Sequence, residues 1–411
     1  MKILLIHNAY QQPGGEDTVV AAETTLLRER GHQVVTYLRS NHELDQLSKP
    51  RQLLLVKDII HSEHSKRDVR ELLGREEPDL VHVHNTFMMI SPSIYTACRE
   101  LDVPVVQTLH NFRLLCPGWT LARNGQVCEE CIDHGLSRSV LHGCYRDSRL
   151  MSAVVALMLQ VHRYRGTWDD QVDAYITLSD FARRKFIQGG LPASKLHVKP
   201  NFVAPDPGER EKPGDYALFV GRLSHEKGIA TLLAAWEKLR TQIPLLLVGE
   251  GPLRESLQAE VTARNLTNVT FKGWLPAAET RTAIKNAAFT ILPSICYEGF
   301  PMSIAESFAC GTPVVCSGLG GMREIVDHHR TGLHFAPGNA GELASRVEWA
   351  WAHPSRLAAM GKEARRQYET SYTAETNYDA LMHIYRSTMA ACGTRATLSI
   401  STKQPATEVH A

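Results

Sequence analysis

Residues 297–306 have the sequence YEGFPMSIAE, and they follow the apolar run AFTILP at 288–293. A short apolar run of this kind is typical of a buried strand. Pro301 is expected to take the first position of a short helix, and Gly311 lies just past the expected helix end. The stretch therefore predicts a strand, a loop and a helix in succession, as in α/β domains.

Two carboxylates accompany this predicted helix. Glu298 lies in the loop before it, beside Gly299, and Glu306 lies about two turns inside it among small apolar residues. A helix N-terminus offers unpaired N–H groups and positive potential, so a ligand bound there is within reach of Glu298. Glu306 is placed to hold a pair of hydroxyls, such as a ribose diol. On these residues alone, an ordinary strand–loop–helix with one surface acid is the alternative.

Length and composition narrow the class of protein. The 411 residues suggest two or more domains. Lys and Arg number 45 against 44 Asp and Glu, so nucleic-acid binding is not expected. No apolar run approaches the ~18 residues of a membrane span, and the run at 3–6 is too short for a signal peptide. We expect a cytoplasmic protein whose nine cysteines are thiols or metal ligands rather than disulfides.

The first half of the chain alternates between strand and helix patterns. A strand at 2–6, a helix at 17–30 and a strand at 33–38 form one βαβ unit, and further strands are predicted at 80–84, 104–108 and 174–178. Gly14 and Gly15 precede the first helix and either let backbone approach a ligand or simply make a tight turn.

Histidines mark the ends of two predicted strands in this half. His82 and His84 belong to the strand at 80–84, and His110 follows the strand at 104–108. Ligands of open α/β sheets gather beyond the carboxyl ends of the strands, which places His110 well for chemistry. A loop histidine that only caps its strand is the alternative.

Residues 201–215, rich in Pro and Gly, predict a linker between two domains. Beyond it the alternation starts afresh, and two Rossmann-like domains are expected. The predicted bounds are 1–203 for the first domain, with an insertion at 116–149, 204–370 for the second, 371–391 for a helix that packs back across both, and 392–411 for a disordered tail. The predicted strands of the second domain are 216–220, 245–248, 268–271, 288–292, 313–316 and 333–335.

Residues 150–161 form a short apolar stretch between Arg149 and Arg163. It is too short to span a bilayer. A buried helix is the favoured interpretation, and a helix lying on a membrane surface is the alternative.

The loop at 221–228 has the sequence GRLSHEKG and carries two cations, Arg222 and Lys227, at the start of a predicted helix. Fixed positive charge together with backbone donors suits a diphosphate. A solvated charged turn is the alternative, but a lysine at a helix start is unfavourable unless an anion is present. The loops at 249–251 and 273–275 are expected at the same end of the sheet, so the shared site has groups for a nucleotide-sugar.

With these loops, the chain resembles the family 4 glycosyltransferases of GT-B architecture over about residues 1–390. The resemblance rests on the 221–228 loop and on Glu298 and Glu306 with seven residues between them, and Gly14, Gly15 and His110 support it. It implies an α/β fold in which two Rossmann-like domains face each other across a cleft. It is specific for the family and not for its sugars.

The resemblance also implies roles for individual residues. Arg222 and Lys227 would bind the donor diphosphate, Glu306 the ribose, and Glu298 the transferred sugar together with backbone N–H groups, while His110 would lie near the reacting carbon. The remaining donor-binding residues it implies are Gly14, Gly15, Gly249, Trp274, Leu275, Gly299, Phe300, Pro301 and Met302.

The implied reaction is sugar transfer from a UDP- or GDP-sugar to a glycan or lipid-linked acceptor, with retention of configuration, in surface polysaccharide synthesis. No metal or other cofactor is expected for catalysis, and the sequence has no Asp-x-Asp triplet. The two cations would then stabilise the leaving diphosphate. Peripheral contact with the inner face of the membrane is a further expectation. Alternatives on the same fold are a nucleotide-sugar epimerase, a glycan phosphorylase or a non-catalytic nucleotide-sugar sensor.

Four cysteines lie in the predicted insertion, two of them as a C-x-x-C pair. Four thiolates at such spacing can hold a structural zinc ion. The segment is rich in glycine and charged residues, so we expect it to need such a staple; four free thiols are the alternative. The candidate ligands are Cys116, Cys128, Cys131 and Cys144, with His134 and His142 as possible substitutes.

Overall fold

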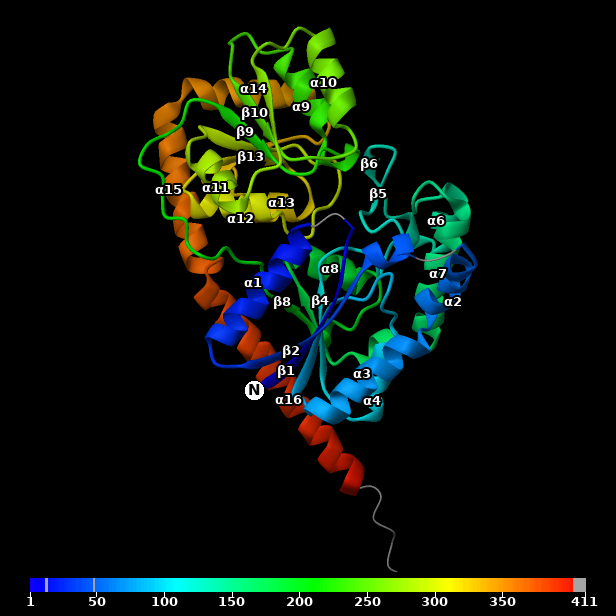
Figure 1. Ribbon diagram of the computed structural model, residues 1–411. Coiled ribbons are helices and arrows are strands. Elements are labelled where there is room, and N and C mark those ends of the chain that lie inside the picture. The colour runs from blue at the N-terminus through cyan, green and yellow to red at the C-terminus, as the bar shows by residue number, and fades with distance from the viewer. Residues whose placement is uncertain (12–13, 47–48, 402–411) are drawn as a thin grey trace, which may run out of the picture.

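The computed structural model describes residues 1–11, 14–46 and 49–401. Two α/β domains lie one above the other and are joined by an irregular linker and by the helices at the end of the chain (Figure 1). Each domain contains a six-stranded sheet in which every paired strand is parallel. Within the described residues no helix is both long enough and apolar enough to cross a bilayer.

The sheet of the first domain has the strand order β2-β1-β3-β4-β7-β8. Helices cover both of its faces, which explains why its central strands are almost entirely buried. The strand bounds are β1 Lys2–Ala9, β2 Gln33–Ser40, β3 Leu80–Asn85, β4 Val105–Leu109, β7 Ala174–Thr177 and β8 Leu196–Val198. All five strands predicted in this half are present, and within this sheet only the three-residue β8 was not predicted.

The helices of the first domain begin with α1, which follows the two glycines. Gly14 is its N-cap and Gly15 its first residue, two residues before the predicted start. Serines cap three other helices by accepting a backbone hydrogen bond, among them Ser179 from Ala182. The bounds are α1 Gly15–Glu29, α2 Lys49–Ile60, α3 Glu63–Glu76, α4 Ser93–Glu100, α5 Glu130–Asp133, α6 Ser137–His142, α7 Arg149–Tyr164 and α8 Asp180–Gln188.

The sheet of the second domain has the order β11-β10-β9-β12-β13-β14. Its six strands confirm the six predicted ones to within one or two residues: β9 Ala217–Val220, β10 Leu245–Val248, β11 Val269–Gly273, β12 Phe289–Leu292, β13 Val314–Ser317 and β14 Gly332–Phe335. The helices are α9 Ile229–Trp236, α10 Arg254–Ala263, α11 Ala277–Lys285, α12 Met302–Ala309, α13 Gly320–Ile325 and α14 Ala340–Ala352.

The chain returns to the first domain through α15 Pro354–Ser371 and α16 Ala374–Ser401 (Figure 1). Leu381, Met382, Ile384 and Tyr385 of α16 are buried against the same face of the first sheet as α1. The prediction of a helix that packs back on the first domain fits this course, but its end at residue 391 was wrong. Residues 392–401, assigned to the tail, continue the helix, because each added residue contributes one further backbone hydrogen bond. The tail residues 402–411 lie outside the described residues.

Candidate active site

The candidate site lies where the loops after β9, β10 and β12 meet the first domain. Backbone hydrogen bonds tie the loops after β9 and β10 to each other and to neighbouring elements: Leu223 N donates to Glu250 O, and Gly249 N donates to Gly273 O at the end of β11. The loop after β12 is tied to the loop after β9 by a bond from Ile295 N to Glu226 O. Gly15, at the start of α1, faces Met302, at the start of α12; a Cβ on Gly15 would lie 3.6 Å from Met302 Cγ. Two helix N-termini therefore face each other between the domains, and both favour an anionic ligand.

Lys227 and Glu298 are in direct contact. Lys227 Nζ donates to Glu298 Oε1 at 2.6 Å, and Ser294 Oγ donates to the same oxygen at 2.7 Å. Burial lowers the pKa of Lys227, but the charge of Glu298 and its hydrogen bond outweigh burial and raise it. The side chains remain 23% and 14% exposed, so a ligand can reach both. The structure thus brings together the cation predicted for the diphosphate and the acid predicted for the sugar.

The 221–228 loop requires a glycine at its end. Gly228 has φ +68°, and a Cβ there would lie 2.0 Å from the carbonyl oxygen of Pro293. Lys227 precedes it in a 3₁₀ turn, His225–Lys227, and α9 begins only at Ile229. Arg222 is exposed at the other end of the loop. Both cations therefore lie in the loop that follows β9, and their role on a diphosphate stays a prediction.

Glu306 lies on α12 and is half-buried. Burial raises its pKa to about 7, against a weaker opposing effect of Arg281. The helix begins at Met302, one residue later than predicted, because Pro301 has ψ 112° and is extended rather than helical. Gly311 follows the helix end with φ +68°, as expected of a glycine after a C-cap.

His110 follows β4 and meets the loop of Glu298. A Cβ on Gly299 would lie only 2.5 Å from the carbonyl oxygen of His110, so this contact between the domains requires glycine. Burial lowers the pKa of His110 to about 3, and its imidazole is therefore neutral. His110 therefore lies against the loop of Glu298, and its place near the reacting carbon, which the resemblance implies, stays a prediction.

Of the other predicted donor-binding residues, Trp274 is 69% exposed and Leu275 packs against a small apolar cluster of the second domain. Phe300 is buried and packs edge-on against Tyr372. Because its side chain is packed in this way, Phe300 would contact a ligand through its backbone N–H. The roles of these three residues stay predictions.

Comparisons with known proteins agree with this geometry. A model of Glycosyltransferase Family 4 matches residues 13–207, and a model of Glycosyl transferases group 1 matches residues 204–367. The chain is 32% identical over 304 residues to a 2-deoxystreptamine glucosyltransferase of Streptomyces kanamyceticus, covering 72% of this chain and 74% of that protein. The chain belongs to the GT-B glycosyltransferases. The predicted fold and enzyme class are thereby confirmed.

Two further comparisons extend this result. The glycosyltransferase is 33% identical to the D-rhamnosyltransferase WbpZ of Pseudomonas aeruginosa over 168 residues, which are 40% of this chain and 44% of that relative. The fold of the present chain is similar to that of the Anabaena protein HepE, which was solved with UDP. The TM-score is 0.67 and the identity is 19%, over 94% of this chain and all of HepE. That likeness shows the fold alone.

A cavity of about 50 Å³ lies beside His110 in the first domain of the glycosyltransferase. Three of its lining atoms are buried polar atoms without a hydrogen-bond partner among the described residues: Gln107 Oε1, Arg113 Nε and Trp168 Nε1. Buried polar groups are normally hydrogen-bonded, so these atoms call for water or for polar groups of a ligand.

Glu16, directly after the two glycines, is a site residue that the sequence did not reveal. Burial raises its pKa to about 8, and Asp17 adds to the effect. Asn111 and Tyr10 lie beside it. Its place directly after the two glycines, at the start of α1, was a signal available in the sequence.

The predicted insertion reaches the second domain. Its hairpin, β5 Ala122–Arg123 and β6 Gln126–Val127, turns at Gly125, where a Cβ would lie 3.5 Å from the His225 ring. The carboxylate of Glu129 accepts from Tyr297 OH at 2.8 Å and from Lys185 Nζ at 2.7 Å. The insertion therefore contacts both loops that carry Lys227 and Glu298, which no sequence pattern indicated.

The four cysteines of the insertion come from different parts of the segment and lie near one another. Cys116 and Cys131 are buried with their thiols hydrogen-bonded, and Cys128 and Cys144 are half-buried. No three of these thiols lie within 4.8 Å of one another in the described part of the chain. Although the segment is rich in glycine and charged residues, Leu121, Leu136 and Tyr145 are buried in the main core of the first domain and help to anchor it. The zinc site stays a prediction.

Proposed function

We propose that this glycosyltransferase moves a sugar from a UDP- or GDP-sugar to a glycan or lipid-linked acceptor, with retention of configuration and without a catalytic metal. The observation that carries the proposal is the Lys227–Glu298 pair, which lies in the same loop region as the Gly299–His110 contact. HepE has been solved with UDP and with UDP-glucose, which supports a nucleotide-sugar donor on this fold. An O-antigen chain mannosyltransferase of Escherichia coli, 27% identical to this chain over 179 residues, supports a role in surface polysaccharide synthesis.

In the proposed reaction, the bond between the sugar's anomeric carbon and the diphosphate breaks, and a bond to the acceptor oxygen forms on the same face. The acceptor proton passes to the leaving diphosphate. Arg222 and Lys227 stabilise the negative charge that develops on the leaving group. Glu298 orients hydroxyls of the sugar, and the cavity beside His110 supplies polar atoms on the acceptor side.

Glu306→Ala is expected to weaken donor binding, because a ribose diol loses its acceptor. The carboxylate accepts such hydrogen bonds only when ionised. Since the pKa of Glu306 is about 7 in the ligand-free protein, wild-type donor affinity should rise between pH 6 and pH 8, and the variant should lack this rise. Isothermal titration with UDP- and GDP-sugars at several pH values measures both effects. Wild-type affinity and pH dependence in the variant would contradict the assignment and weaken the proposed function.

Contact with a membrane is proposed for one face of α7. Leu150, Leu157 and Tyr164 recur every seven residues on this helix and are 75%, 52% and 93% exposed, while its other face is buried. The buried-helix interpretation therefore holds for one face of α7, and contact of the other face with a membrane stays a proposal. An apolar stripe flanked by arginines is typical of a helix that lies on an anionic bilayer.

Leu150→Glu/Leu157→Glu is expected to abolish sedimentation of the enzyme with anionic vesicles at low salt. Wild-type binding should weaken as salt is added, because surface charge is screened. Leu38→Glu, a substitution of an exposed leucine in β2, is the matched control and should bind like wild type. A wild type that does not sediment at low salt would favour a soluble acceptor.

A structural zinc ion held by the four insertion cysteines is also proposed. The donor set is chemically suitable, and Cys116 and Cys131 are already in contact. Binding would require the thiols to converge, because tetrahedral zinc–sulfur bonds are about 2.3 Å long. The ion would brace the segment that carries Glu129.

Elemental analysis of protein prepared without a histidine tag should find about one zinc per chain. Cys128→Ser/Cys131→Ser should lose the metal, and Cys392→Ser, outside the insertion, should keep it. Active, folded enzyme without bound metal would end this proposal.

A further inference from the structure

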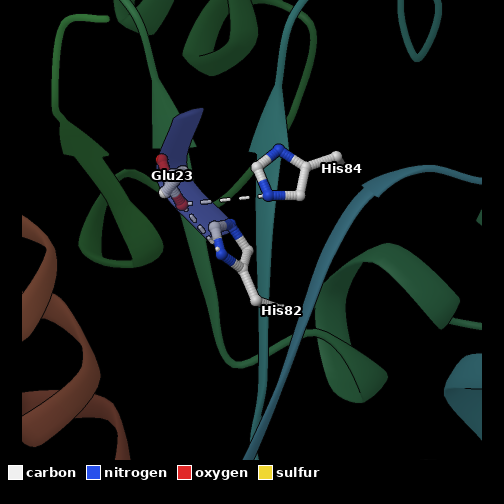
Figure 2. A group of neighbouring side chains, drawn as sticks. All are labelled: Glu23, His82 and His84. Carbon is white, nitrogen blue, oxygen red and sulfur yellow. Dashed lines mark ion pairs between the residues drawn. The ribbon is translucent and has the colours of Figure 1, made fainter. Parts of the chain in front are cut away.

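A buried group of ionisable side chains lies behind His110 in the first domain. Glu23 projects from α1 toward β3, where His82 and His84 lie on the same side of the strand (Figure 2). Glu23 Oε1 lies 3.2 Å from His82 Nδ1 and 3.8 Å from His84 Nε2, and the three side chains are almost completely enclosed. They can therefore affect a bound ligand only through another residue.

Lys199 determines the charge of Glu23. Its ammonium lies 3.0 Å from Glu23 Oε2, is equally buried, and also donates to Asn377 Oδ1 of α16. Burial raises the pKa of Glu23, but Lys199 and the hydrogen bond with His82 outweigh burial and hold the pKa well below its ordinary value. Glu23 is therefore a carboxylate, paired on one oxygen and facing two imidazoles with the other.

The ligand atoms of Glu23, His82 and His84 lie close enough together to hold a metal ion. The ammonium of Lys199 argues against that use. It already neutralises the single carboxylate, and inside a protein it would strongly repel a divalent cation a few ångströms away. The group is better suited to fixing the tautomers of neighbouring histidines than to binding a metal ion.

The Glu23 carboxylate determines which ring nitrogen of His84 carries the proton. Burial holds the pKa of His84 well below its ordinary value, so the ring is neutral and carries one N–H. Its Nε2 faces Glu23 and its Nδ1 faces His110. An anionic oxygen favours a proton on the nitrogen that faces it, so Nε2 carries the hydrogen and Nδ1 keeps its lone pair.

The tautomer of His84 in turn determines the tautomer of His110. Its Nε2 lies 2.9 Å from His84 Nδ1, and the two ring planes are tilted by only 23°, as suits a hydrogen bond in the ring planes. Because His84 Nδ1 has no hydrogen, His110 Nε2 must donate. The lone pair of the neutral His110 ring is then on Nδ1.

We propose that Glu23 and His84 are positioning residues that hold His110 in its Nε2–H tautomer, so that Nδ1 accepts a hydrogen bond from a hydroxyl of the donor sugar. The buried aspartate of the Ser-His-Asp triad fixes a histidine tautomer in a similar way. The role of Nδ1 rests on the proposed function, whereas the tautomer itself does not depend on it. Glu23 and His84 touch neither substrate nor reacting atoms.

The test is nitrogen NMR of ¹⁵N-histidine-labelled, ligand-free enzyme, with His110 assigned by means of His110→Gln. Wild type should show a protonated Nε2 and an unprotonated Nδ1 at His110. Glu23→Gln/Lys199→Met removes the buried charges together, so no unpaired charge is left behind. In this double variant both His110 tautomers should be populated, and kcat should fall by about tenfold or more with little change in donor affinity.

Tyr385→Phe is the matched control. It removes a hydroxyl that lies 2.7 Å from His82 Nδ1 and leaves Glu23, His84 and His110 in place, so the His110 signals should not change. A proton on Nδ1 of His110 in wild type, or unchanged His110 signals in a folded double variant, would overturn the proposal. If His110 shows the expected tautomer but the protein turns over no nucleotide-sugar, the proposed function would be rejected. The conclusion that Glu23 and His84 fix the His110 tautomer would still stand.

Discussion

Lys227→Ala is expected to slow sugar transfer by about a hundredfold or more, the scale seen when a charge partner of the transition state is removed. Lys227 lies at the end of the loop after β9 with its ammonium half-enclosed, so no neighbouring water can replace it fully. Arg222→Ala should act in the same direction. Lys238→Ala, an exposed lysine on the same domain, is the matched control and should transfer at the wild-type rate.

The measurement is single-turnover transfer from labelled UDP- or GDP-sugar, because it isolates the chemical step. Added EDTA should leave this step unchanged in zinc-replete enzyme. A strict requirement for magnesium or manganese, together with a near-normal rate in Lys227→Ala, would show that a metal and not this lysine stabilises the leaving group.

Glu298→Gln should lower kcat by about tenfold or more while the donor dissociation constant changes less, because its proposed partner is the sugar in transfer rather than the nucleotide. The amide is nearly isosteric, and its Oε1 can still accept from Lys227 and Ser294. A loss in this variant therefore reports the missing charge. Equal losses of affinity and turnover would place Glu298 on the nucleotide instead.

A double-mutant cycle tests the contact between these two residues. Lys227 and Glu298 are hydrogen-bonded, so the effects of Lys227→Ala and Glu298→Ala should not add. Each single variant also leaves the other charge unpaired. Additive losses would mean that the pair separates before the donor reacts.

The alternation of apolar runs and glycine-rich turns predicted both sheets, because buried parallel strands are nearly continuous apolar segments. The short β8 was missed, since Leu196-His197-Val198 is too brief to show a period. The last helix was predicted to end at residue 391, too early, because the sequence from Gly393 onward is rich in Thr and Ser and shows no periodicity.

The sequence indicated individual residues of the candidate site but not which of them are in contact. Lys227 and Glu298 were each recognised from local loop chemistry, but their contact joins residues 71 apart in sequence. The Glu129–Tyr297 hydrogen bond joins residues 168 apart, and the Glu23–Lys199 pair joins residues 176 apart. A single sequence carries no signal for such pairings, because they arise only when separate elements pack together.

The course of α16 has a consequence for biosynthesis. Tyr385 and Asn377 contact the buried group around Glu23, and their helix covers one face of the first sheet. The ribosome makes these residues after the entire second domain, although domains usually fold in the order in which they emerge. The domain that is synthesised first is therefore completed last, and until α16 arrives the sheet face that it shares with α1 is only partly covered.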